Sequence, residues 1–272
     1  MTDMNDATYL RTQQYRDASN LNSRIALHQR FSTNTGDLHR WLFDHLLAAL
    51  SPDARILEVG CGPADLWRKN LDRLPAGWRV TLTDFSPGMI AAAQSALMGH
   101  EAQFSFQVAD TQALPFADAS FDTAIANYML YHVPDRPRAI AELARVLTPD
   151  GHLFAATNGE NNMRELTELI APYLPTSASD EFPYPLRGFT LQNGAEQLAP
   201  CFSDITIERF DDGLRITEAA PLVAYVRSMP SGFAPPPEQI PHFTRDIEQR
   251  IATDSAIHIT KETGLFSATK AR

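Results

Sequence analysis

Two closely spaced glycines, Gly60 and Gly62, are the residues of this sequence best suited to holding a ligand. They follow an apolar stretch that begins at Ile56 and precede a helix-like segment that reaches Trp67. Glycine lets backbone groups approach a ligand closely and tolerates a positive φ, which a side chain would oppose. The spacing therefore predicts a binding loop between a strand and a helix.

An acidic residue, Asp84, ends the second apolar stretch, 24 positions beyond Gly60. A carboxylate there can accept hydrogen bonds from both hydroxyls of a ribose. The alternative role is to cap the helix that begins near Ser86-Pro87. Two nucleotide-binding schemes use such a loop and acid, but the dinucleotide fingerprint has a third small residue where this chain has Asp65. A nicotinamide or flavin cofactor is therefore disfavoured.

The side chains best suited to proton transfer lie in the segment 127–135, which follows the fourth apolar stretch. A neutral imidazole at His132 can accept a proton from an attacking hydroxyl or amine, which predicts a general base. The alternative is a histidine hydrogen-bonded to backbone. Tyr131 either positions a substrate or packs. Ligands of open α/β folds bind at the carboxyl edge of the sheet, where this segment is expected to lie.

The elements that must position these residues alternate between strand and helix patterns. Such alternation predicts an α/β fold with a parallel sheet, right-handed crossovers and helices on both faces. Thr263-Gly264 either kinks the last strand or marks a turn within it. Strands are predicted at 54–60, 79–84, 103–109, 121–127, 151–157, 203–210 and 255–268. Helices are predicted near 64–73, 87–98, 136–147, 190–200, 217–228 and 237–253.

Helical and proline-rich segments outside this pattern are expected to cover the binding site. Tyr15, Arg24 and His28 could close over a ligand, since Arg24 and His28 share a helix face; a solvated face is the alternative. The predicted organisation is an N-terminal helical lid at 1–50, a cofactor-binding core at 51–158, an insertion or substrate cap at 159–189, and the C-terminal part of the same sheet domain at 190–272.

Composition excludes several classes of protein. The 272 residues, 44% of them hydrophobic, suffice for one large core. A formal charge of −10 argues against a nucleic-acid partner, and no stretch approaches the roughly 20 apolar residues that span a bilayer. Two cysteines, Cys61 and Cys201, and a polar N-terminus indicate a cytoplasmic protein without a disulfide framework. No cluster shows metal-ligand spacing.

The chain resembles the class I S-adenosylmethionine-dependent methyltransferases, specifically the small-molecule group called type 11. This resemblance implies a Rossmann-like, mostly parallel seven-stranded sheet. It depends on five motifs in order, which span about 54–158: Glu58-Val59-Gly60-Cys61-Gly62, Asp84-Phe85-Ser86-Pro87-Gly88-Met89, Ala109-Asp110-Thr111, Phe121-Asp122-Thr123-Ala124-Ile125 and Pro149-Asp150-Gly151-His152-Leu153.

The resemblance also implies a role for each motif residue. The two glycines would admit the methionine moiety of the cofactor, and Glu58 would order the loop or reach the ammonium through water. Asp84 would take the ribose diol and Asp110 the adenine amino group. Phe85 and Met89 would supply apolar surface for adenine, with core packing as the alternative. The cofactor-binding residues implied are Glu58, Gly60, Cys61, Gly62, Asp84, Phe85, Met89, Asp110, Thr111 and Asn127.

The expected function is methyl transfer from S-adenosylmethionine to a small soluble molecule by direct in-line displacement, yielding S-adenosylhomocysteine. Methyltransferases of exocyclic base amines usually carry two prolines where this chain has Tyr128 and Met129, so nucleobase methylation is disfavoured. Two alternatives stay open: a nicotinamide-dependent reductase, and a non-catalytic module that binds S-adenosylmethionine.

Overall fold

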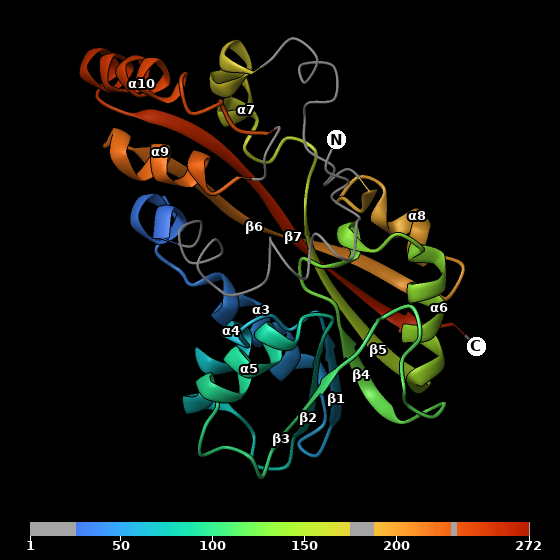
Figure 1. The fold of residues 1–272 in the computed structure, drawn as a ribbon. Coiled ribbons are helices and arrows are strands. Elements are labelled where there is room, and N and C mark those ends of the chain that lie inside the picture. Colours follow the sequence, from blue (N-terminus) through green and yellow to red (C-terminus); the bar gives the residue numbers. More distant parts are fainter. Residues whose placement is uncertain (1–25, 175–187, 230–232, 272) are drawn as a thin grey trace. The chain divides into compact units, whose positions relative to one another are not determined.

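The computed structural model describes residues 26–174, 188–229 and 233–271 (Figure 1). These residues divide into two compact units. The sheet unit comprises 36–159, 188–210 and 263–271 of these residues. The helical unit comprises 26–35, 160–174, 211–229 and 233–262. Strands β6 (Phe202–Ile216) and β7 (Ile257–Lys270) contribute residues to both.

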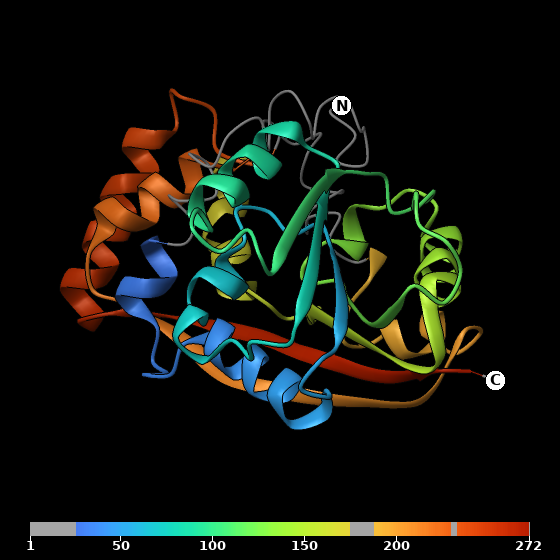
Figure 2. The same ribbon diagram turned by 90° about the horizontal axis from the view of Figure 1, so that it is seen from below.

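The described residues form one seven-stranded sheet in the order β3-β2-β1-β4-β5-β7-β6. The first five strands pair in parallel, and β7 runs antiparallel to β5. In Figure 2 the long strands β6 and β7 run side by side. The remaining strands are β1 (Arg55–Val59), β2 (Arg79–Asp84), β3 (Phe104–Val108), β4 (Phe121–Ile125) and β5 (Leu147–Asn158).

Helices cover both faces of the sheet unit (Figure 1). Ile56 and Leu57 are neighbours on β1 and both fully buried, yet they belong to different core clusters because side chains alternate across a strand. The cluster of Ile56 includes residues of α3 (Leu38–Ala49), α4 (Asp65–Arg68) and α5 (Pro87–Ala96). The cluster of Leu57 includes residues of α6 (Arg136–Val146) and α8 (Gly194–Leu198).

The helical unit has a core of its own. Leu27 and Phe31 of the helical segment 26–31 pack there with the buried faces of three further helices. Its buried side chains recur at the three- and four-residue spacings of amphipathic helices, as in Leu222, Val223 and Val226. The helices are α7 (Arg164–Ile170), α9 (Ala219–Arg227) and α10 (Ile240–Asp254).

The predicted α/β fold with a mostly parallel seven-stranded sheet is confirmed. The observed units divide the chain differently from the predicted segments. Helix α3 lies in the sheet unit rather than with 26–35, because Leu42, Phe43 and Leu46 are buried in the sheet's core. The stretch 211–262, predicted to continue the sheet domain, falls in the helical unit because its helices pack in that unit's core.

Gly264 does not mark a turn, since β7 continues through it. A Cβ at this position would lie 2.6 Å from the carbonyl oxygen of Glu208 on β6. The glycine therefore permits a close approach of two strand backbones. Strand β5 is also longer than predicted and starts at Leu147, directly after α6.

Candidate active site

The glycine loop leaves β1 with two residues in the left-handed region, Gly60 at φ +62 and Gly62 at φ +53. The loop is tied to β2, because the backbone N–H of Cys61 donates to the carbonyl oxygen of Thr83 at 2.9 Å. A Cβ at Gly62 would meet no atom within 4 Å, whereas a Cβ at Gly60 would lie 2.7 Å from Cβ of Met129. Gly62 thus borders open space, and Gly60 is required by the protein's own packing.

Asp84 joins the ends of β1 and β2 through its carboxylate. One oxygen accepts the backbone N–H of Gly62 at 3.0 Å, and the other accepts that of Ser86 at 2.8 Å. The capping alternative for Asp84 is wrong, because the residue that caps α5 is Ser86, whose side chain accepts the N–H of Met89. Burial raises the pKa of Asp84 while the two backbone donors lower it. Each carboxylate oxygen keeps lone pairs for further donors.

Glu58 is 3% exposed and faces the helix that follows the loop. Its carboxyl accepts the indole N–H of Trp67 at 2.5 Å and a hydrogen bond from the Asn127 side chain. Burial raises the pKa of Glu58 to about 8, against the lowering effect of these donors and with the help of nearby Asp84. Glu58 therefore links β1, α4 and Asn127, which lies two residues after β4.

The free energy of unfolding is expected to depend on pH through Glu58. In the folded protein the pKa of Glu58 is about 8, above the ordinary carboxyl value. The contribution of the protonated carboxyl to the free energy of unfolding is therefore complete below the ordinary pKa, and it is lost as the pH rises toward 8. Over that window the free energy of unfolding of the wild type should fall relative to Glu58→Gln, by at most about 1.4 kcal/mol per pH unit. Urea unfolding across this pH range measures the difference. Glu248→Gln, at an exposed position on α10, is the control, and a pH-independent difference would contradict the assignment.

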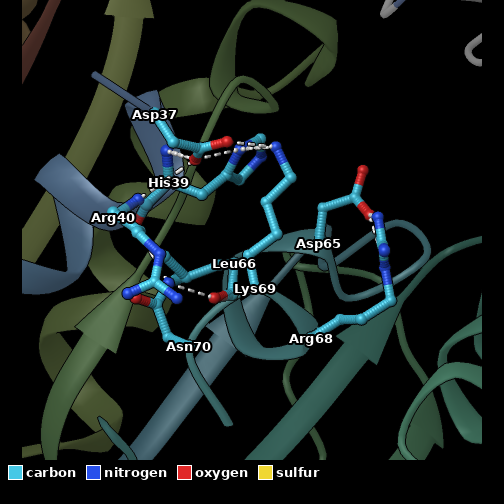
Figure 3. Close-up of polar contacts among 8 residues, drawn as sticks. All are labelled: Asp37, His39, Arg40, Asp65, Leu66, Arg68, Lys69 and Asn70. Carbon is cyan, nitrogen blue, oxygen red and sulfur yellow. Dashed lines mark hydrogen bonds and ion pairs between the residues drawn. The ribbon is translucent and has the colours of Figure 1, made fainter. Parts of the chain in front are cut away.

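Helix α4 is anchored to the start of α3 by polar contacts (Figure 3). One Asp37 oxygen caps α3 by accepting the N–H groups of His39 and Arg40, at 2.8 and 3.2 Å. The other lies 2.7 Å from Nζ of Lys69, which ends α4. Hydrogen bonds from His39 and Lys69 hold the pKa of Asp37 well below its usual range. Asn70 adds a hydrogen bond to the His39 carbonyl oxygen. These contacts restrain the helix that closes the glycine loop.

The residues expected near an adenine ring differ in exposure. Phe85 is 39% exposed at the end of β2, whereas Met89 is 2% exposed. The burial of Met89 favours the core-packing alternative for that residue. Asp110 follows β3 and accepts hydrogen bonds from the backbone and side-chain amides of Gln112, which orient its carboxylate. Thr111 is buried beside it.

The segment after β4 brings the candidate base to the same edge of the sheet. Asn127 accepts the N–H of Ala156 through Oδ1 at 3.2 Å, and Met129 lies against the glycine loop. A short 3₁₀ helix, η3 (Leu130–His132), follows. The rings of Tyr131 and His132 meet edge to face with centroids 4.5 Å apart. The backbone N–H of His132 donates to the Met129 carbonyl oxygen at 2.9 Å.

The predicted lid residues are only partly described. Tyr15 and Arg24 lie outside the described residues. His28 lies in the helical unit, where its ring meets that of Tyr225 edge to face at 5.9 Å. Burial and the charge of Lys261 lower the pKa of His28 to about 4. Its part in covering a ligand stays a prediction.

Sequence reasoning missed the role of Trp67 in the site and the contact of Met129 with Gly60. The sequence pattern identifies Trp67 only as an apolar helix residue. In the structure its indole N–H donates to the buried carboxyl of Glu58. The nine-residue separation from Glu58 spans a loop whose path cannot be derived from periodicity. A glutamate inside an otherwise apolar strand was the available signal, since a buried carboxyl needs a donor.

Among the described residues, no helix combines the length and apolar character needed to cross a membrane. Nor do they contain a group of three or more His, Cys, Asp or Glu side chains arranged to hold a metal ion.

The fold and the site together define a nucleotide-binding α/β protein, in which a glycine loop after the first strand faces an acid at the end of the second. Residues 57–155 match the family described as "Methyltransferase domain". The resemblance to the class I S-adenosylmethionine-dependent methyltransferases is confirmed for this part of the chain.

Relatives carry this domain in different enzymes. The chain is 34% identical over 134 residues to malonyl-(acyl-carrier protein) O-methyltransferase of Erwinia billingiae, covering 48% of this chain and 49% of that protein. It is 36% identical over 124 residues to ubiquinone/menaquinone biosynthesis C-methyltransferase of Dinoroseobacter shibae, covering 44% and 49%. The aligned stretches span 42% to 61% of the lengths of the curated relatives that the chain matches.

A solved structure with the same fold is phosphoethanolamine N-methyltransferase 2 of Haemonchus contortus in complex with S-adenosyl-L-methionine. The TM-score is 0.60 at 17% identity, and the match covers 100% of this chain and 61% of that one. At this identity the similarity concerns the fold.

Proposed function

We propose that this protein transfers a methyl group from S-adenosylmethionine to a small molecule. The observation that carries the proposal is the pairing of Gly62 with Asp84. At Gly62 a Cβ would stand in open space. The Asp84 carboxylate accepts the N–H of Gly62 and can still accept further hydrogen bonds at the carboxyl edge of the sheet. A glycine loop that a ligand can approach closely, next to a carboxylate that can bind ribose hydroxyls, suits the adenosine and methionine parts of S-adenosylmethionine.

The residues present fit each part of such a cofactor. Asp84 would accept hydrogen bonds from the ribose hydroxyls, and the exposed face of Phe85 would stack on adenine. Asp110, held by Gln112, would accept from the adenine amino group. The buried carboxyl of Glu58 would act on the methionine end by keeping Trp67 and the loop in place.

When bound, the cofactor supplies a sulfonium whose methyl carbon is already electrophilic. The protein's part is therefore to align the acceptor with that carbon, to exclude water and to remove a proton where the acceptor carries one. His132 is the candidate base that would accept this proton. Tyr131, whose ring contacts the His132 ring, is the candidate for positioning the methyl acceptor.

We infer a small acceptor from the site and the charge. Tyr128 and Met129 stand where base-amine methyltransferases carry prolines, and the net charge of −10 disfavours a polyanionic substrate. The relatives are named for O-, C- and N-methylation, so the domain does not prescribe the acceptor atom.

The decisive experiment incubates the protein with methyl-labelled S-adenosylmethionine and a pool of small metabolites, and measures S-adenosylhomocysteine and labelled product. Turnover that depends on the pool supports the proposal. Binding of S-adenosylmethionine without turnover in any pool would instead indicate a binding module. Thermal stabilisation by NADPH but not by S-adenosylmethionine would indicate a reductase, against which Asp65 and the buried Glu58 already argue.

Alanine substitutions at the two glycines should separate folding from binding. Gly60→Ala brings Cβ onto Met129 and should lower the free energy of unfolding by about 2 kcal/mol. Gly62→Ala meets no neighbour, so only the positive φ opposes it, at about 1 kcal/mol, but its methyl enters the proposed cofactor space. Urea unfolding and S-adenosylhomocysteine calorimetry measure the two effects. Equal binding by wild type and Gly62→Ala would count against this placement of the cofactor.

A further inference from the structure

Tyr128 adopts a backbone conformation that its side chain disfavours. Its φ is +55, in the left-handed region that bulky residues rarely occupy. Its backbone N–H donates to the carbonyl oxygen of Ala156 on β5 at 2.8 Å, so the turn is hydrogen-bonded to the sheet at the carboxyl end of β4. Such strained residues persist only where the surroundings restrain them, and they concentrate at functional sites.

The restraint on Tyr128 comes from its phenol. The hydroxyl lies 2.6 Å from Oγ1 of Thr263 on β7, and Thr263 donates its single hydrogen to the carbonyl oxygen of Thr157 at 3.3 Å. Tyr128 is therefore the donor in the first bond. Both threonines are buried, at 3% and 1% exposure. Burial raises the pKa of Tyr128 to about 12, so the phenol stays protonated and continues to donate.

The residues on either side of Tyr128 belong to the candidate site. Asn127 hydrogen-bonds Glu58, which holds the helix after the glycine loop through Trp67. Met129 lies against Gly60. Because a left-handed residue reverses the local direction of the chain, the conformation of Tyr128 decides where both neighbours point.

We propose that Tyr128 is a positioning residue, whose phenol, held by Thr263, fixes the left-handed turn that places Asn127 beside Glu58 and Met129 against the glycine loop. Its effect on cofactor affinity rests on the proposed function; its effect on the loop does not. In this role the phenol acts through its neighbours Asn127 and Met129.

The test uses Tyr128→Phe, Thr263→Val and the double variant, each of which keeps the side-chain volume nearly unchanged. Calorimetry with S-adenosylhomocysteine should show a Kd raised about 3- to 10-fold in each single variant, because each loses the hydrogen bond between the phenol and Thr263. The double variant should be no weaker than Thr263→Val alone, because that substitution already removes the bond to Tyr128, besides the one to Thr157. Tyr173→Phe, which removes a phenol hydrogen bond to Asp246 within the helical unit, is the matched control and should leave Kd unchanged.

Hydrogen exchange supplies a readout that needs no ligand. Amides of 127–133 should exchange faster in both single variants while those of 55–59 keep wild-type rates, whereas global destabilisation would accelerate both segments. Wild-type exchange at 127–133, or additive effects in the double variant, would overturn the proposal. Wild-type protein that fails to bind S-adenosylhomocysteine would refute the proposed function, and the exchange experiment would still decide the role of Tyr128.

Discussion

Replacing His132 with alanine is expected to lower the rate of methyl transfer about 10²- to 10⁴-fold, the range typical of a lost general base. His132 ends η3 at the carboxyl edge of the sheet, and its backbone is fixed by Met129. Alanine preserves that backbone and removes the imidazole. The rate would be measured with the acceptor that the metabolite screen identifies.

Affinity for S-adenosylhomocysteine separates catalysis from binding in this variant. It should stay within about twofold of wild type, because no cofactor contact is assigned to His132. Tyr131→Phe is the companion variant, since it keeps the ring that meets His132 and removes only the hydroxyl. Wild-type turnover in His132→Ala would show that another group, or water, takes the proton.

Asp84→Ala is expected to weaken cofactor binding by about 1–3 kcal/mol, or roughly 5- to 150-fold in Kd. Two contributions act together. The carboxylate would no longer accept the ribose hydroxyls, and the N–H of Gly62 would lose its acceptor, so the loop would lose one of its ties to β2 while the bond from Cys61 to Thr83 remains. Isothermal calorimetry with S-adenosylhomocysteine measures the loss.

Two further variants make the Asp84 result interpretable. Asp84→Asn retains one acceptor oxygen, so its Kd should fall between those of wild type and Asp84→Ala. Asp118→Ala removes an exposed carboxylate that pairs with Arg145, and should leave the affinity unchanged. Unchanged affinity in Asp84→Ala would mean that the ribose binds elsewhere.

Much of the sheet could be derived from sequence because its determinants are local. The apolar runs that form β1 to β4 are short and bounded by polar residues, so period and length identified them. Gly60, Gly62 and Asp84 were recognisable because backbone freedom and a strand-end carboxylate are properties of single positions. The structure indeed places these three at one loop.

The division into units could not be derived in the same way. β6 and β7 read as ordinary strands, but each contributes residues to both units. Whether a helix such as α3 joins the sheet depends on which distant apolar surface it buries, and periodicity reports only that one face is apolar.

The sequence by itself determined the nucleotide-binding character of the protein, because strand pattern, glycine spacing and a terminal acid are local chemistry. Only the tertiary structure decided how the site is held: the Glu58 carboxyl on the Trp67 indole, Met129 against Gly60, and the Tyr128 phenol on Thr263. Tyr128 and Thr263 lie 135 residues apart, and Met129 and Gly60 are also distant along the chain. Such contacts arise from the pairing of strands, which sets distances that no local pattern encodes.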